Sequence, residues 1–222
     1  MSRILVDQVR SNSASGDAIT LDGNGKCAIN ATTINSLTFP TSDGSADQLI
    51  KTNGSGALSF GTVAGGIPFG QQWVMTTGFH PSSAAATVFS SNLAVKTGNS
   101  YCTVGSGTMT ESSGVFTFPS TGIYRVEGFI MFRNSSDTRV NCELDIQTST
   151  DSGSSFSRGM LAVVRCENQD YYTAYGCLQV DVTNTSTQKV RFVYAGATSI
   201  YIHGNSQNDS QTYFQFTKLG DT

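Results

Sequence analysis

Charge is scarce in this chain of 222 residues, and the charges that are present do not cluster. Charged residues make up 13% of the sequence, the formal net charge is −3, and the 13 Lys and Arg residues form no basic block. A protein that binds nucleic acid needs a concentrated positive surface. The sequence therefore predicts no nucleic acid among the partners.

Long apolar runs are also missing. No stretch approaches the roughly 20 apolar residues that a membrane span needs. The first residues, MSRILVDQVRSNS, contain neither the apolar core nor the cleavage site of a secretory signal. We therefore expect that the protein does not insert into a membrane. We expect it to be made in the cytoplasm of a host cell and released by a route such as lysis.

The sequence has few residues that could form a metal or catalytic cluster. The five cysteines are widely spaced, without a C-x-x-C pair, and some stand in alternating apolar segments such as VNCELDI. That pattern favours buried thiols, and a disulfide framework is the alternative. His80 and His203 have no Cys or carboxylate at ligand spacing. Loops such as NSQNDS offer few acids, so a calcium site has little support. We predict no cofactor, no metal and no enzyme.

What the chain does have is abundant Gly, Ser, Thr and β-forming residues, a composition typical of all-β extracellular or virion proteins. Residues 1–70 hold short β-like bursts such as RILVDQV and ALSFGTV, separated by turn signals such as GNG and TNGSG. None of these bursts could bury a core alone. The pattern predicts an attachment arm and a short stalk over residues 1–70, and a disordered linker is the alternative.

Residues 71–222 follow a different pattern. Segments such as IYRVEGFIMFR, VNCELDIQTST and KVRFVYAG succeed one another between polar turns, and apolar side chains alternate at Cys142, Leu144 and Ile146. Strands at this spacing, with almost no helix signal, predict an all-β fold, either a β-sandwich or a jelly roll.

Within these strands, ESSGVFTFPSTGIYRVEGFIMF resembles the signature of C1q/TNF-like jelly rolls, with Gly122 and Tyr124 in the family's Gly-x-Tyr turn. Later segments, YGCLQVDVTNTSTQKVRFVYAG and QTYFQFTKLG, are similar to the family's closing strands, although STQK replaces the usual Gly-Asp of one turn. The resemblance implies a compact homotrimer whose first-and-last-strand sheet packs around the threefold axis. By position, it implies Tyr124, Phe214 and Phe216 as subunit-interface residues. The collagen stalk of C1q proteins is absent, because residues 1–70 show no Gly-X-Y period.

The segment SLTFPTSDGSADQLIKTNGSGALSF resembles the N-terminal region of tail-fibre and related virion proteins from marine and cyanobacterial phages. That resemblance implies a stalk or attachment region, in which isolated apolar side chains pack across a threefold axis. The attachment residues that we expect in the first burst are Ile4, Leu5 and Val6.

Together these features predict a virion structural protein, a short trimeric tail fibre. Its arm would dock on other virion proteins, and its C-terminal knob would contact a glycan or protein of the host surface. One alternative is a capsid decoration or head-fibre protein with no receptor role. Another is a glycan depolymerase, which would need a carboxylate pair in a groove.

Receptor contacts in such knobs usually lie on loops. The polar loops with nearby aromatic residues are RNSSDTR, ENQDYY and HGNSQNDSQTY, and solvated turns without a role are the alternative. The candidate receptor contacts in them are Asn168, Asp170, Tyr171, Tyr172, Tyr201, Asn205 and Asn208.

Overall fold

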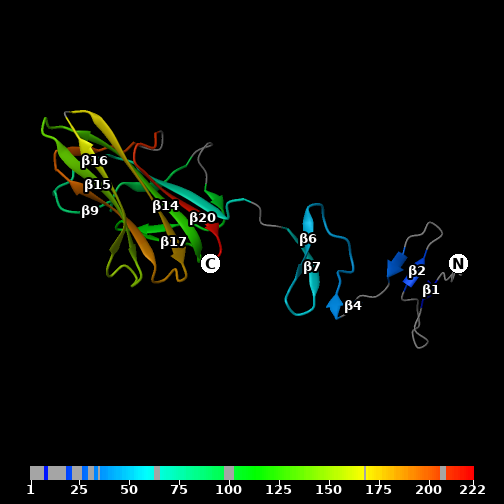
Figure 1. Ribbon diagram of the computed structural model, residues 1–222. Coiled ribbons are helices and arrows are strands. Elements are labelled where there is room, and N and C mark those ends of the chain that lie inside the picture. The colour runs from blue at the N-terminus through cyan, green and yellow to red at the C-terminus, as the bar shows by residue number, and fades with distance from the viewer. Residues whose placement is uncertain are drawn as a thin grey trace, which may run out of the picture. The chain divides into compact units, whose positions relative to one another are not determined.

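The chain divides into two units, Met1–Ala64 and Gly65–Thr222, in the computed structural model of the protein (Figure 1). The structure describes residues 36–62, 66–97, 103–167, 169–205 and 209–222, together with the backbone of four short strands between residues 8 and 34. Every regular element in these residues is a β-strand, as the all-β prediction requires. The second unit begins before residue 70, because strand β8 (Phe69–Met75) already belongs to it.

The first unit consists of short antiparallel pairings. Strands β1 (Gln8–Val9), β2 (Ile19–Leu21) and β3 (Cys27–Ile29) form one small sheet. Strand β4 (Thr33–Ile34) pairs with β5 (Leu37–Thr38), and β6 (Gln48–Thr52) pairs with β7 (Leu58–Thr62). The predicted attachment residues Ile4, Leu5 and Val6 lie outside the described residues.

The β6–β7 hairpin shows how a segment with few apolar residues can still form regular structure. Its turn is closed by Asn53, whose Oδ1 accepts hydrogen bonds from the backbone N–H groups of Ser55 (2.8 Å) and Ala57 (3.0 Å). Leu49 and Ile50 remain 56% and 55% exposed in the single chain. The turn chemistry therefore builds the hairpin locally, while its apolar side chains are left without a core of their own.

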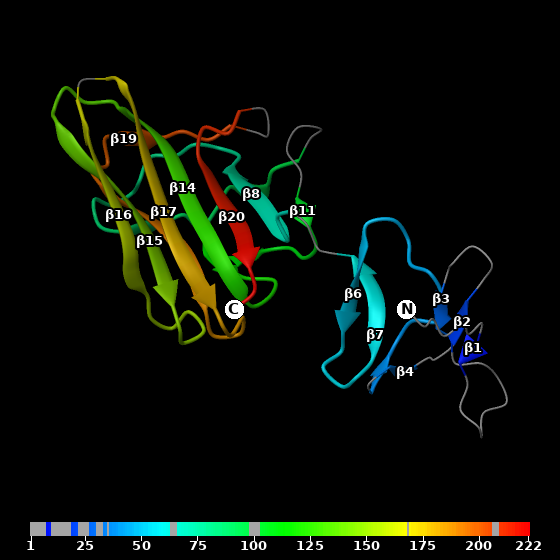
Figure 2. The same ribbon diagram turned by 45° about the vertical axis from the view of Figure 1, so that its right-hand side comes forward.

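The second unit is a sandwich of two antiparallel sheets (Figure 2). The first sheet has the order β10 (Leu93–Val95), β8, β20 (Tyr213–Gly220), β14 (Gly122–Asn134) and β17 (Tyr171–Val182), with β11 (Val104–Gly105) beside β8 and β19 (Ile200–Ile202) beside β14. The second sheet has the order β12 (Thr110–Ser112), β13 (Val115–Thr117), β18 (Lys189–Gly196), β15 (Val140–Ser149) and β16 (Ser157–Cys166), with β9 (Thr87–Val88) beside β18.

The pairing of the main strands is that of a jelly roll. Taken in chain order as β8, β13, β14, β15, β16, β17, β18 and β20, the first strand pairs with the last, the second with the seventh, the third with the sixth and the fourth with the fifth. Each pair then falls in one of the two sheets, and the chain crosses between the sheets by Greek-key connections. The predicted jelly-roll sandwich is confirmed by this order.

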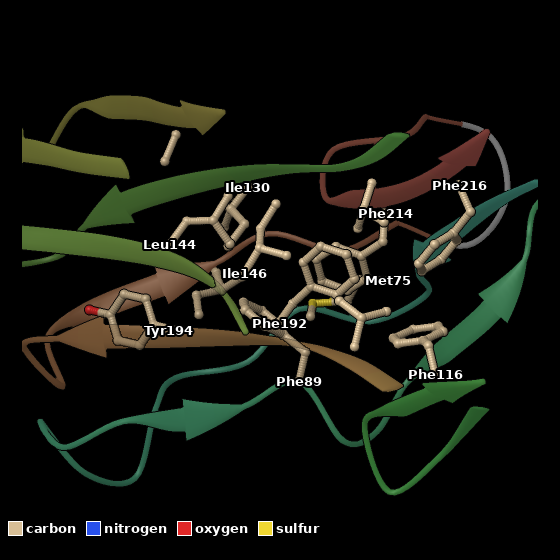
Figure 3. Packing of buried hydrophobic residues seen from close by; sticks show 14 of the residues in the cluster. Met75, Phe89, Phe116, Ile130, Leu144, Ile146, Phe192, Tyr194, Phe214 and Phe216 are labelled. Carbon is tan, nitrogen blue, oxygen red and sulfur yellow. The ribbon is translucent and has the colours of Figure 1, made fainter. Parts of the chain in front are cut away.

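The core lies between the sheets and is strongly aromatic. On β14 the side chains alternate strictly between buried and partly exposed, as one inward face and one outward face require. Phe192 from the second sheet stacks on Phe214 from the first, with centroids 3.9 Å apart and the rings inclined by 12°. Figure 3 shows these two rings among Phe89, Phe116 and Phe216. Aromatic contacts therefore join the two layers.

This core corrects the predicted subunit interface. Tyr124, Phe214 and Phe216 are each 0% exposed in the single chain. Their side chains point inward between the sheets, so no surface of theirs is left for a second copy to cover. The interface prediction is wrong for these three residues, because an apolar face of a strand in the sequence does not state which neighbour buries it.

The Gly-x-Tyr turn has a clear structural role. Gly122 adopts a φ of +141°, and a Cβ at this position would lie 2.6 Å from the carbonyl oxygen of Gly220. Tyr124, two residues later, donates its buried hydroxyl to the carbonyl oxygen of Ser120 (3.0 Å). Glycine is needed where β14 meets the end of β20, and the tyrosine fastens the turn that precedes it.

Candidate functional site

Several polar loops meet at one end of the sandwich. Strand β8 ends at Met75, β14 ends at Asn134, β17 begins at Tyr171 and β20 begins at Tyr213, and the register places these strand termini at the same end of the first sheet. We call this the loop end. The opposite end, where β8 begins at Phe69 after the segment that joins the two units, is the linker end. Loops 135–139 and 197–199 lie at the loop end, together with the described residues of loop 167–170 (Figure 2).

Asn134 holds two of these loops together. Its side chain is fully buried, and its Nδ2 donates to the carbonyl oxygen of Thr138 (2.8 Å). Its Oδ1 accepts from the backbone N–H of Ser136 (3.1 Å) and from the hydroxyl of Ser199 (3.2 Å). The N–H of Ser135 also donates to the carbonyl oxygen of Ser199 (3.1 Å). A buried amide with this many partners fixes the loops as a rigid platform.

The loop over residues 167–170 is fastened to the same platform. Arg139 forms an ion pair with Glu167 (Nε to Oε1, 3.1 Å), and the N–H of Asn134 donates to the carbonyl oxygen of Asp170 (3.4 Å). Both members of the ion pair are largely exposed, so it adds little stability. One backbone hydrogen bond and one exposed ion pair therefore connect this loop to the platform.

Next to the platform, four rings and one arginine form what we call the ring cluster: Tyr171, Arg133, Tyr201, His203 and His80. Arg133 lies opposite both Tyr171 and Tyr201 in the strand register, and its guanidinium carbon is 5.7 Å from the centroid of the Tyr171 ring. His203 lies 5.2 Å from Tyr171 and 4.7 Å from Tyr201, and His80 lies 5.0 Å from Tyr201. Two strands, β17 and β19, and two loops thus contribute the four rings, and β14 contributes the arginine.

The two imidazoles of the ring cluster differ in their surroundings. His80 is exposed, and its Nδ1–H donates to the carbonyl oxygen of Ile200 (2.9 Å). His203 is partly buried, and its Nε2 has no hydrogen-bond partner among the described residues. Burial first, and the positive charge of Arg133 second, lower the pKa of His203. The protonated form of His203 is therefore disfavoured, and the partly buried ring carries a polar atom without a partner in the described part of the chain.

The structure separates the predicted receptor contacts into different groups. Tyr171 is 52% exposed and Tyr201 partly exposed, and both belong to the ring cluster. Asp170 is exposed beside them, with its Oδ1 accepting the N–H of Tyr171 (2.8 Å). Asn205 bonds Asp209 through Nδ2 (3.1 Å). Asn168 and Asn208 lie outside the described residues.

Tyr172 does not join the ring cluster. It stands opposite Phe132, a fully buried residue, and its ring packs against the core. Strand alternation puts Tyr171 and Tyr172 on opposite faces of β17, so one tyrosine of the pair must point inward. Its hydroxyl donates to the carbonyl oxygen of Glu167 (3.0 Å), which helps to fasten the loop below the site.

The sequence did not identify Arg133, His203 and His80 as site residues. Arg133 meets its two tyrosines only because β17 and β19 both pair with β14, and His80 is brought in by the isolated bridge between Phe79 and Ile202. One usable signal was present. In YIHG, residues two apart on a strand share a face, which places Tyr201 and His203 together.

The outer face of the first sheet carries a second aromatic feature, the aromatic row. Tyr175, Phe129 and Tyr213 lie side by side on β17, β14 and β20, and the rings of Phe129 and Tyr213 stack with centroids 5.2 Å apart. The hydroxyl of Tyr175 bonds the Glu127 carboxylate, and this bond raises the pKa of Tyr175. Arg125 reaches the same hydroxyl (3.1 Å). These rings point away from the sandwich core.

Within the described residues no group of three or more His, Cys, Asp or Glu is placed to hold a metal ion. That same part of the chain contains no helix of the length and hydropathy that crossing a bilayer would require.

No protein family and no curated protein matches this sequence. Among solved structures, murine APRIL is 11% identical with a TM-score of 0.46, covering 68% of this chain and 98% of its own. Eiger TNF from S. frugiperda is 12% identical with a TM-score of 0.47, covering 70% and 95%. PRD1 vertex protein P5 is 19% identical with a TM-score of 0.42, covering 70% and 100%. The jelly-roll assignment rests on the strand order of this chain itself.

Proposed function

We propose that this protein is a non-enzymatic virion structural protein, a short trimeric fibre. Its first unit, including Ile4, Leu5 and Val6, attaches to other proteins of the particle, and its jelly-roll unit contacts the host surface. The resemblance of the N-terminal segment to tail-fibre proteins supports the attachment role, as does its lack of a core of its own. The single observation that carries the receptor role is the ring cluster at the loop end, away from the point where the linker enters the sandwich.

The chemistry of the ring cluster suits a saccharide. Tyrosine rings offer flat apolar surface to the C–H face of a sugar, and nearby polar atoms fix its orientation. Tyr171 is half-exposed and Asp170 presents its carboxylate beside it. Arg133 adds a guanidinium, which binds carboxylate or sulfate oxygens in a bidentate manner. The ligand class that we propose is a glycan of the host surface that carries acidic groups.

For assembly, we propose that three copies meet through the aromatic row rather than through Tyr124, Phe214 and Phe216. The row is the outward aromatic surface of the sheet that holds the first and last main strands, and Tyr175 within it is 47% exposed. The exposed Leu49 and Ile50 of the stalk hairpin would pack against the same residues of the other copies. Three linked sites raise the effective concentration to about the millimolar range, so weak binding at each site is sufficient.

The test compares matched aromatic variants at the two ends of the sandwich. Tyr171→Ala and Tyr201→Ala remove rings from the loop end. The control, Phe156→Ala, removes a ring from the loop after β15, at the linker end. The guanidinium carbon of Arg191 lies 4.0 Å from the centroid of that ring. The purified full-length chains would be applied to an array of neutral and acidic glycans, and particles carrying each variant would be tested for adsorption to host cells.

We expect both loop-end variants to lose most of the glycan signal and to adsorb at least tenfold more slowly, while Phe156→Ala behaves like the parent protein. All three should keep the parent's assembly mass. Unchanged adsorption of the loop-end variants in fully assembled particles would contradict a receptor role and would favour the decoration or head-fibre function. A chain that lacks residues 1–64 should fail to enter particles, and its incorporation would contradict attachment through the first unit.

A further inference from the structure

Two buried cysteines lie against each other in the second sheet. Cys142 on β15 and Cys166 on β16 are each 0% exposed, and their Sγ atoms are 3.0 Å apart. Cys142 stands opposite Val164 and Cys166 opposite Val140, so the two thiols are diagonal neighbours on the core face of adjacent antiparallel strands. The sequence predicted buried thiols but not that two of them would be in contact.

The geometry is close to that of a disulfide. An S–S bond is about 2.05 Å long, so the sulfurs need to approach by about 1 Å. Diagonal positions across antiparallel strands are about 7–8 Å apart, just beyond the Cα separation of about 7 Å that a disulfide spans, so closing the bond requires the strands to move closer together. Strand β16 ends the order of its sheet, and among the described strands it pairs only with β15. It is the strand of the pair that can move.

The two thiols are not equivalent. Their mutual hydrogen bond lowers the pKa of Cys166 and raises the pKa of Cys142. Cys166 therefore loses its proton first, and the thiolate is the reactive form of cysteine. Cys177 offers an internal comparison, because it lies opposite Glu127 on the outer face of the other sheet, away from this pair.

We propose that Cys142 and Cys166 are an oxidisable pair that closes to a cross-strand disulfide when the folded protein meets hydrogen peroxide. The Cys166 thiolate attacks one oxygen of the peroxide, the O–O bond breaks, and Cys166 becomes a sulfenic acid while the second oxygen leaves as hydroxide and takes up a proton to form water. The thiol of Cys142 then attacks that sulfur, the S–S bond forms, and a second water leaves with the proton of Cys142. Two thiols are oxidised, and one peroxide is reduced to two waters.

The position of the bond gives it a structural consequence. Cys166 directly precedes loop 167–170, and Val140, its partner in the register, directly follows loop 135–139. The ion pair between Arg139 and Glu167 joins the same two loops. A disulfide at Cys166, the residue before Glu167 of this ion pair, would fix the distance between the two loops of the platform. The inference does not depend on the proposed function, because it concerns the sheet alone.

The experiment treats the folded full-length chain with a small excess of hydrogen peroxide, then unfolds it, alkylates the remaining thiols and maps the peptides by mass spectrometry. We expect the intact mass to fall by two hydrogen atoms and a cross-linked peptide to join Cys142 with Cys166. Because the bond closes a loop of 24 residues, the oxidised protein should melt on the order of 10 °C higher, and a phosphine reductant should reverse the shift.

Two variants serve as matched controls. Cys177→Ser should respond to peroxide as the parent does, and Cys142→Ala should give neither the cross-link nor the rise in melting temperature. Full alkylation of both cysteines after peroxide would overturn the proposal, as would a cross-link to another cysteine or a stable sulfinic acid at Cys166. If Cys142→Ala does not fold, the peptide map of the parent and of Cys177→Ser decides the question alone.

Discussion

Phe214 and Tyr213 are neighbours on β20 that point in opposite directions, and they allow folding to be separated from assembly. Phe214 is fully buried and stacks on Phe192 at 3.9 Å, with Phe89 at 5.3 Å. Tyr213 lies in the aromatic row and stacks on Phe129. We predict that Phe214→Ala weakens the fold and that Tyr213→Ser weakens the assembly.

The size of the first effect follows from the packing. Replacing a buried phenylalanine by alanine costs about 3–5 kcal/mol, through lost transfer free energy and the cavity that remains. Aromatic pairs add about 0.5–1.5 kcal/mol beyond the buried area, and Phe214 belongs to more than one such pair. Because the range for truncating a buried phenylalanine already includes such ring contacts, we expect a loss in its upper half, about 4–5 kcal/mol. At about 2–4 °C per kcal/mol for a domain of this size, the melting temperature should fall by about 8–20 °C.

For Tyr213→Ser we expect a loss of about 1 kcal/mol in the free energy of unfolding of the single chain, because the ring is only partly buried. Urea unfolding at two protein concentrations measures both stabilities, and light scattering after gel filtration measures the assembled mass. A Phe214→Ala protein of near-parental stability but reduced mass would refute the reasoning, since it would place Phe214 between copies. A trimer that survives Tyr213→Ser and Phe129→Ser together would remove the aromatic row from the interface.

Two further predictions concern single positions. Gly122→Ala should lower the free energy of unfolding by about 1–3 kcal/mol, because an L-residue is strained at φ +141° and its Cβ would crowd the oxygen of Gly220. Urea unfolding measures this loss. Gly220→Ala is the control, because a Cβ at that position meets nothing within 4 Å. His203→Gln should flatten the fall in stability between pH 7.5 and 5.5. Burial and the charge of Arg133 lower the pKa of His203 in the folded protein. The neutral ring therefore contributes fully to the free energy of unfolding above the ordinary pKa of about 6.5, and this contribution is lost as the pH falls through the lowered pKa of the folded protein. His80→Gln should leave the slope unchanged, and an unchanged slope in His203→Gln would show that another group is responsible.

Much of the architecture follows from local patterns in the sequence. Alternation at Cys142, Leu144 and Ile146 reports a strand with one buried face, and turn residues such as Asn53 mark where a hairpin reverses. Both signals act over a few residues, so they can be interpreted without knowledge of the fold. For the same reason the polar loops at the loop end could be identified as candidates before any strand was paired.

What only the tertiary structure decided is which partner each strand face meets. Phe214 was predicted to meet a second copy, yet Phe192, from the other sheet of the same chain, covers it. The ring cluster forms because β17 and β19 both pair with β14, and the thiols of Cys142 and Cys166 meet because β15 and β16 adopt one register. Pairing and register depend on contacts between residues far apart in the chain. A strand's own sequence specifies that it has an apolar face, and the packing of the whole sandwich determines what that face contacts.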